Sequence, residues 1–213
     1  MNTQFPKKIA DNVNMYSGDP ILYVVNDFVS ESECAEFIAA SNEALQGSAE
    51  VSRDQQITLE GRTSENYWIQ HDANEVIHEV SKRLSILTQI PIRNAEQFEL
   101  VFYKQGTQYR PRFDSFDYET EDGKKKWEPG GQRMITVMVF LNDVQAGGET
   151  HFPELGVTIT PKKGDVVIFH NTLTEVPPPS HPRTHPKSIH AGMPVIKGEK
   201  WMVNLRFREN LRY

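Results

Sequence analysis

The second half of the chain, from Glu96 onward, is a succession of short apolar runs separated by clusters of Gly, Pro, Asn and Asp. Such runs predict short β-strands, and a series of them favours a sandwich or a barrel. No long helical pattern alternates with them, which argues against a doubly wound parallel sheet. The predicted strands are Phe98–Tyr103, Met134–Leu141, Val157–Ile159, Val166–Phe169 and Trp201–Phe207.

The first half of the chain predicts helices. Ser30 opens one of them, because Glu33 three residues later completes a capping box. A second helix is predicted from Asp72 onward, and Pro91 ends it. Helices followed by an all-β half predict an α+β protein.

Residues 1–19 show no clear periodicity and are expected to form a loose N-terminal arm. The rest of the chain, residues 20–213, is predicted to be a single domain, because a chain of this size usually forms one. A first strand is predicted at Pro20–Val25. The long polar segment Asp117–Gln132 is predicted to be a loop beside the β scaffold.

Composition excludes several classes of protein. The formal net charge of −6 argues against a nucleic-acid-binding surface as the main function. Cys34 is the only cysteine, so neither an internal disulfide nor a cysteine-rich zinc site is possible. No apolar run approaches the length of a membrane span, and the first residues do not resemble a signal peptide. We therefore expect a cytoplasmic protein with no membrane or nucleic-acid partner.

Several short motifs follow one another along the chain. They are Ile21–Cys34, Gly61–Ser64, the segment from Tyr103 to Asp114, Gly130–Arg133, Gly147–Thr150, Pro161–Asp165, His190–Val195 and Gly198–Trp201. Taken in this order, they resemble the motifs of the prolyl 4-hydroxylase family of iron(II)- and 2-oxoglutarate-dependent dioxygenases. The resemblance extends from Pro20 to Glu209.

The resemblance implies a fold and an activity. The fold is a double-stranded β-helix (jelly-roll or cupin-like) core with supporting N-terminal helices. The activity is hydroxylation of a peptide or protein side chain, with proline the expected target, while 2-oxoglutarate is decarboxylated to succinate. The cofactors implied are Fe(II), 2-oxoglutarate as co-substrate, O2 and ascorbate, and the partner implied is a peptide or protein substrate.

The resemblance also implies roles for individual residues. In the usual facial triad, two His and one carboxylate bind iron and leave positions open for the co-substrate and dioxygen. Asp114 and His190 would be metal ligands. Lys200, Thr150 and Tyr103 would bind 2-oxoglutarate, and the side chains expected in the catalytic site are Arg112, Tyr109 and Arg133.

Arg112 stands where the first His of the triad is expected, two residues before Asp114. Arginine has no free lone pair for a metal, repels a divalent cation, and can form an ion pair with Asp114. Strand alternation puts residues 112 and 114 on one face, so Arg112 can turn outward only if Asp114 also leaves the site. Arg206, in turn, stands where the family usually has a Trp.

Three interpretations follow from Arg112. A working site survives with water or another His as ligand, or the domain is a catalytically silent 2-oxoglutarate or peptide binder, or another metal or chemistry uses the site. The alternative ligands are His151, His170, His181 and His185, of which His151 is disfavoured because alternation puts it opposite Thr150. A generic β-sandwich interaction domain gives no reason for Lys200 and Thr150 to occur in these motifs.

Overall fold

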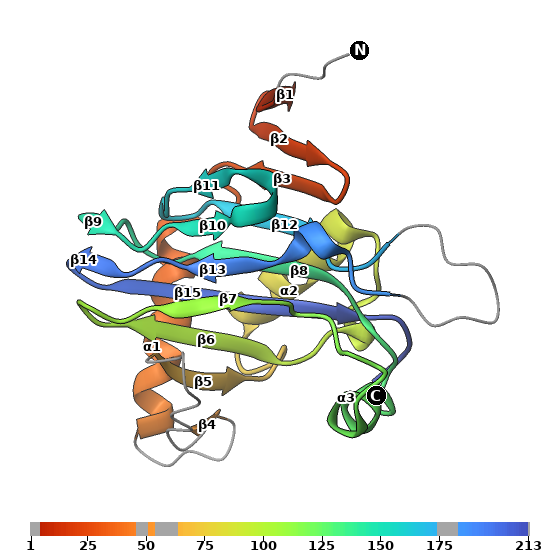
Figure 1. Ribbon diagram of the computed structural model, residues 1–213. Helices are drawn as coiled ribbons and strands as arrows, with labels where there is room; N and C mark the ends of the chain where they lie inside the picture. The colour runs from red at the N-terminus through yellow and green to blue at the C-terminus, as the bar shows by residue number, and fades with distance from the viewer. Residues whose placement is uncertain (1–4, 46–50, 54–63, 174–182, 213) are drawn as a thin grey trace.

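Two β-sheets lie face to face, and two helices cover the outer face of the larger sheet (Figure 1). The computed structural model describes residues 5–45, 51–53, 64–173 and 183–212. Helices from the first half therefore support a β core that comes mainly from the second half, as the sequence predicts.

The larger sheet has nine strands within the described residues. In spatial order they are β1 (Lys7–Ala10), β2 (Val13–Gly18), β3 (Ile21–Val25), β12 (Val166–His170), β8 (Arg133–Phe140), β15 (Lys200–Arg208), β6 (Phe98–Tyr103), β5 (Glu65–Ile69) and β4 (Val51–Arg53). The smaller sheet consists of β11 (Val157–Ile159), β10 (Thr150–Phe152), β13 (His190–Gly192) and β7 (Tyr109–Arg112). A further pair joins β9 (Ala146–Gly147) to β14 (Val195–Lys197).

The central strands read as continuous apolar runs because both of their faces are buried. Along β8, Val137 and Val139 pack into the cluster shared with the helices, whereas Met138 and Phe140 pack between the two sheets. Successive side chains of a strand point to opposite faces, so a strand covered on both sides needs apolar residues throughout. The space between the sheets is therefore lined by every second residue of the central strands.

Capping side chains set where the helices begin. α1 (Glu31–Leu45) begins with the predicted capping box, in which the Glu33 amide donates to Ser30 Oγ at 3.3 Å and the Ser30 amide donates to Glu33 Oε2 at 2.8 Å. α2 (Glu75–Thr88) begins three residues later than predicted, because the side chain of Asn74 caps it and accepts from the Ile77 amide at 2.8 Å. No described helix is both long and apolar enough to cross a membrane.

Three segments differ from the sequence predictions. The expected loose arm contains β1 and β2, which pair with each other and with β3, because backbone pairing needs no apolar pattern. The expected loop Asp117–Gln132 contains α3 (Glu121–Trp127), whose Thr120 cap accepts from the Gly123 amide at 3.0 Å. Strand β5 was also missed, since its first residues, Glu65 and Asn66, continue the polar segment before them, although its Tyr67 and Ile69 are buried in the core.

A buried ion-pair cluster around Glu96 ties together one end of the larger sheet. Arg133, at the start of β8, donates to both carboxylate oxygens of Glu96 at 2.7 Å. Arg208, at the end of β15, donates to the same carboxylate at 2.7 Å. Burial would raise the pKa of Glu96, but Arg133, Arg206 and Arg208 outweigh it and lower the pKa to about 2.

We expect Glu96→Gln to lower the free energy of unfolding by roughly 3 kcal/mol at neutral pH, since it leaves buried guanidinium groups without their carboxylate. Because the folded pKa of Glu96 lies below its ordinary value, the stabilisation is present above pH 4.5 and is lost as the pH falls toward 2. Urea unfolding of both proteins across this range measures the difference.

Glu79→Gln is the matched control for this prediction. Glu79 pairs with Lys82 on the surface of α2, so its replacement should leave the urea midpoint unchanged. Equal effects of the two substitutions would show that the Glu96 cluster does not stabilise the fold.

Candidate functional site

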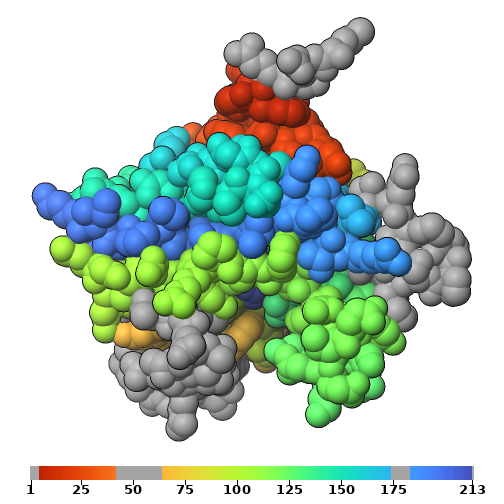
Figure 2. Space-filling model, in the orientation of Figure 1, coloured from red at the N-terminus to blue at the C-terminus, as the bar shows by residue number. Residues whose placement is uncertain are grey.

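The pairing of β7 with β13 brings two of the predicted site residues face to face. Arg112 is the cross-strand partner of His190, and opposite residues of an antiparallel pair share one face of the sheet. In Figure 2, β7 in yellow-green lies beside the blue segment that contains β13. Asp114 follows β7 and is buried, as is His190, and the side chain of Arg112 is 16% exposed, whereas Phe113 between Arg112 and Asp114 is exposed. Residues 112 and 114 therefore point inward together, as alternation predicts.

Asp114 is surrounded by donors and cations. Its Oδ2 atom accepts from Thr136 Oγ1 at 2.8 Å and from Arg206 Nε at 3.2 Å. Its Oδ1 atom lies 3.9 Å from His190 Nε2 and 4.0 Å from Arg112 Nε. Burial would raise the pKa of Asp114, but the charges of Arg206 and Arg112 outweigh it, so the pKa lies well below the ordinary value. Asp114 is therefore a carboxylate at neutral pH.

His190 is a neutral imidazole with one ring nitrogen left over. It is fully buried, and burial and the charge of Arg112 lower its pKa to about 4. Its Nδ1 atom lies 3.0 Å from the carbonyl oxygen of Ser188, to which it donates. Its Nε2 atom therefore carries the lone pair, faces Asp114, and has no hydrogen-bond partner among the described residues.

Arg112 occupies the space beside these two side chains. Its guanidinium lies over the Tyr109 ring, with the central carbon 3.5 Å from the ring centroid. This stacking and the nearby Asp114 hold the group inside, so the outward orientation considered for Arg112 is wrong. Its Nη1 atom is buried and has no hydrogen-bond partner in the described part of the chain.

Lys200 begins β15 and is 1 % exposed. Its Nζ atom donates to the carbonyl oxygen of Gly148 at 2.7 Å and lies 5.3 Å from the centroid of the Tyr103 ring. Both Gly147 and Gly148 have positive φ, which turns the chain before β10. Burial and the charge of Arg112 lower the pKa of Lys200 to about 7.

Tyr103 and Thr150 lie on the inner faces of the two sheets. Tyr103 is the cross-strand partner of Lys200 and packs in the cluster between the sheets. Thr150 is buried, and Phe152, the next inward residue of β10, has its ring 5.7 Å from the His190 ring. The residues expected to bind the co-substrate are thus inward-facing residues of the facing sheets, as are the two expected metal ligands.

Tyr109 and Arg133, which were expected in the catalytic site, contact other residues of the site. Tyr109 is half-buried beneath Arg112. Arg133 uses its guanidinium for Glu96 and donates from Nη1 to the backbone oxygen of Asp114 at 3.3 Å. These contacts position Arg112 and Asp114, while contact of Tyr109 and Arg133 with a substrate stays a prediction.

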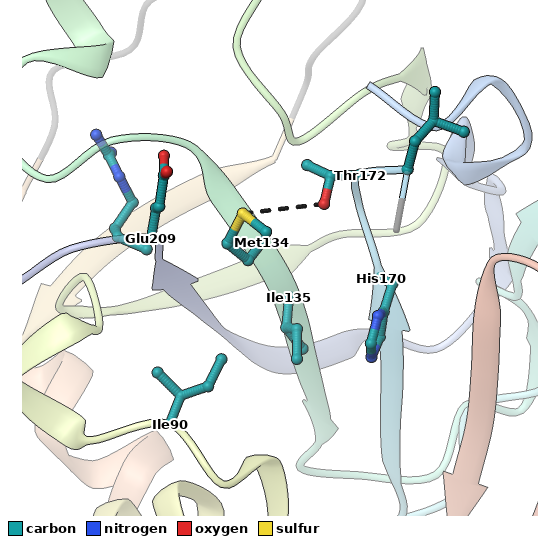
Figure 3. A pocket seen from close by; sticks show the side chains of 8 residues that line it. Ile90, Met134, Ile135, His170, Thr172 and Glu209 are labelled. Atoms are coloured by element: carbon teal, nitrogen blue, oxygen red, sulfur yellow. Dashed lines mark hydrogen bonds between the residues drawn. The ribbon is translucent and has the colours of Figure 1, made fainter. Parts of the chain in front are cut away.

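None of the described alternative histidines completes a metal site. His151 points away from Thr150 and its Nδ1 contacts Thr158 Oγ1 at 2.9 Å, as alternation predicts. His185 contacts Asp19 at 3.0 Å. His170 lines a separate pocket of about 400 Å³ with Met134, Ile135, Thr172 and other residues (Figure 3). His181 lies outside the described residues.

Glu99, and the pairing of Arg206 with Glu99 and Asp114, form a part of the site that sequence reasoning missed. Arg206 Nη2 lies 2.7 Å from Glu99 Oε2, and its Nε donates to Asp114. Glu99 also accepts from Asn66 Nδ2 at 2.8 Å. The available signal was a charged residue inside a largely apolar run, Glu99 in Phe98–Tyr103 and Arg206 in Trp201–Phe207, because a buried charge requires a partner.

Comparison with known proteins agrees with the family resemblance found in the sequence. Residues 98–208 match the family model described as the 2OG-Fe(II) oxygenase superfamily. Prolyl 4-hydroxylase 5 of Arabidopsis thaliana is 31% identical over 216 residues, which cover 89% of this chain and 68% of the relative.

Solved structures share the fold. The viral collagen prolyl hydroxylase of Paramecium bursaria Chlorella virus-1, in complex with 2OG, is 29% identical with a TM-score of 0.68, covering 88% of this chain and 95% of that chain. A prolyl hydroxylase of Trichoplax adhaerens, in complex with a peptide fragment of hypoxia inducible factor, has a TM-score of 0.62 over 88% of this chain and 83% of that chain. At 17% identity, the second comparison shows the fold alone.

These findings confirm the predicted double-stranded β-helix and the predicted family of iron(II)- and 2-oxoglutarate-dependent oxygenases. They support the 2-oxoglutarate-dependent prolyl hydroxylase function predicted from the sequence over a generic interaction domain. The matched segment includes position 112, so the family match by itself does not establish a complete iron site.

The described residues do not fit a facial triad. Asp114 and His190 are in place, but no group of three His, Cys, Asp or Glu side chains in the described part of the chain could hold a metal ion. Arg112 brings a positive charge and no lone pair to the third position. Two ligands beside a guanidinium form an incomplete and electrostatically unfavourable iron(II) site.

We expect Arg206→Met to lower the free energy of unfolding by about 3–5 kcal/mol, because it leaves Asp114 and Glu99 as buried carboxylates without their shared cation. Chemical denaturation measures the loss. Arg110→Met, an exposed change on the neighbouring strand β7, should leave the midpoint where it is. If Arg206→Met were as stable as the wild type, the Arg206 pairs would contribute nothing to folding.

Proposed function

Since the chain belongs to the 2OG-Fe(II) oxygenase superfamily, we propose that it binds 2-oxoglutarate between its two sheets and hydroxylates prolyl residues of a peptide. The observation that carries the proposal is Lys200, a buried lysine that faces the space between the sheets without a carboxylate partner among the described residues. The expected products are succinate, carbon dioxide and the hydroxylated peptide.

The co-substrate 2-oxoglutarate supplies the carboxylate partner that Lys200 lacks within the described part of the protein. A buried ammonium that donates only to a neutral carbonyl is poorly compensated, and a carboxylate is its natural partner. We place the distal carboxylate of 2-oxoglutarate on Lys200, with the hydroxyl groups of Thr150 and Tyr103 as further donors. The low exposure of Lys200 and Thr150 excludes water, which strengthens these interactions.

A peptide is the proposed substrate because the relatives are named as prolyl hydroxylases, and one structure with the same fold contains a peptide. Tyr109 and Arg133 are the proposed substrate-side residues, and α3 lies in the segment expected to close over the peptide. Hydroxylation also requires O2 and, by the family's chemistry, iron(II) and ascorbate. The third iron ligand is the missing component of this proposal.

A second function is favoured by Arg112. A guanidinium in the third metal position would leave a catalytically silent protein that binds 2-oxoglutarate or a prolyl peptide. The two functions differ in whether the wild-type chain turns over 2-oxoglutarate when iron is supplied.

Iron(II) titration and succinate release, measured with 2-oxoglutarate and a proline-rich peptide, test the proposed function. The hydroxylase function predicts iron-dependent turnover by the wild type that is lost in His190→Ala, whereas the silent binder predicts no turnover by either protein. Arg112→His should bind iron(II) at least roughly tenfold more tightly, because it replaces a repelling cation with a ligand. Turnover by Arg112→His with none by the wild type would overturn the hydroxylase proposal in favour of the silent binder.

The affinity for 2-oxoglutarate should depend on pH through Lys200. In the free protein, burial and the charge of Arg112 lower the pKa of Lys200 to about 7, while the charge of Glu149 acts to raise it. The Tyr103 and Phe140 rings also face the Lys200 ammonium group. A bound carboxylate raises this pKa. The dissociation constant should therefore be flat below pH 7 and increase by up to about tenfold per pH unit above it.

Calorimetric titration of 2-oxoglutarate between pH 6 and pH 9 measures this dependence, and repeating it in buffers of different ionisation enthalpy counts the proton taken up. A flat profile with no proton uptake above pH 7 would show that Lys200 does not bind the ligand as an ammonium.

A further inference from the structure

The space between the sheets contains more buried positive than negative charge. Arg112, Arg206 and Lys200 are the inward-facing cations, and Asp114 and Glu99 are the carboxylates. Arg206 lies 2.7 Å from Glu99 and 3.2 Å from Asp114, so it is paired with both carboxylates. Arg112, at 4.0 Å from Asp114, has only a distant partner, and Lys200 has a neutral one. Arg112 and Lys200 are therefore the two cations without a close carboxylate partner among the described residues, and the five groups together carry an excess of one positive charge.

Arg112 also holds an unused donor in a fixed position. Its guanidinium is stacked on the Tyr109 ring, and the side chain is 16% exposed. Its buried Nη1 atom has no partner in the part of the chain that the structure describes. Buried donors are nearly always satisfied, so an unpaired one that faces a binding space indicates a ligand acceptor. A guanidinium whose orientation is already fixed binds a carboxylate with a smaller loss of freedom.

Arg112 and Lys200 act on the same space. Tyr109, on which Arg112 is stacked, is the cross-strand partner of Gly192. Gly192 lies against the Tyr103 side chain, whose ring centroid is 5.3 Å from Lys200 Nζ, so the two cations border the same part of the protein interior. Two cations that repel each other in a buried space are both stabilised by a ligand that carries two negative charges. A dicarboxylate meets this requirement, whereas a monocarboxylate neutralises only one of them.

We infer that Arg112 binds the carboxylate of the 2-oxo acid end while Lys200 binds the distal carboxylate, so that this chain binds 2-oxoglutarate without a metal ion. The inference rests on the proposed function only in that 2-oxoglutarate occupies this site. Arg112 then performs the charge-compensating part of the role that a metal ion has elsewhere in the superfamily. It does so through hydrogen bonds, which need no free lone pair on the protein.

The test is calorimetric titration of 2-oxoglutarate into protein and buffer that have been passed over a chelating resin. We expect the wild type to bind without metal, and added iron(II) to change the dissociation constant less than about threefold. Arg112→Gln should bind at least roughly tenfold more weakly, because a charge-assisted hydrogen bond is lost. Pyruvate, a 2-oxo monocarboxylate, should bind more weakly than 2-oxoglutarate to the wild type.

Matched variants separate the role of Arg112 from general effects on the fold. Arg110→Gln changes an exposed arginine of the same strand and should leave the affinity unchanged. Arg112→His should lose metal-free binding and regain it when iron(II) is added, which a destabilised protein would not do. Thermal unfolding of each variant verifies that it is folded at the titration temperature.

Two results would overturn the inference: wild-type binding that appears only with iron(II), or metal-free affinity that is unchanged in Arg112→Gln. A different result would overturn the proposed site itself. If the wild type binds no 2-oxoglutarate with or without metal, or if Thr150→Val and Lys200→Met bind as well as the wild type, the ligand is not where we place it.

Discussion

Asp114 is a buried carboxylate, and the cation that neutralises it decides what the space between the sheets can bind. A carboxylate in such a place stays ionised only if positive charge compensates for its lost hydration. In this chain Arg206 supplies that charge at 3.2 Å, and Thr136 adds a hydrogen bond at 2.8 Å. The carboxylate is therefore compensated by the protein itself.

The register of two short strands then determines the character of the site. Because Arg112 lies directly opposite His190, any side chain at position 112 has to share the space with the imidazole and with Asp114. An imidazole there would offer a lone pair to a metal. A guanidinium offers only donors, and stacking on Tyr109 holds it in place. One change of residue type thus converts a space suited to a cation into one suited to an anion.

Family membership consequently informs about the fold, whereas the chemistry of the site residues informs about what the site binds. The sheets, the helical support and the segment matched by the superfamily model follow from the packing of apolar strands, which position 112 does not alter. Function depends on the few side chains that line the space between those sheets. Lys200, Thr150 and Tyr103 are compatible with a dicarboxylate in either case, so the residues proposed to bind the distal carboxylate are all present.

Sequence patterns predicted those parts of the fold that local burial determines. The central strands were found because both of their faces are buried, and the start of α1 because its capping box is local. Strands β1 and β2 were missed because they are held by backbone pairing and carry little apolar pattern, and β5 was missed because its polar start continues the segment before it. Helix α3 was missed because a short polar helix with one capping threonine resembles a loop in sequence.

The sequence by itself determined the residue types at the site: Asp114, His190, a lysine at the start of the last strand, and an arginine at position 112. Only the tertiary structure decided how their charges are paired. Arg206 meets Asp114 across 92 residues of chain, and Glu99 joins them from a third strand. Such pairs depend on which strands become neighbours in the sheet, and periodicity within a single strand contains no information about its neighbours.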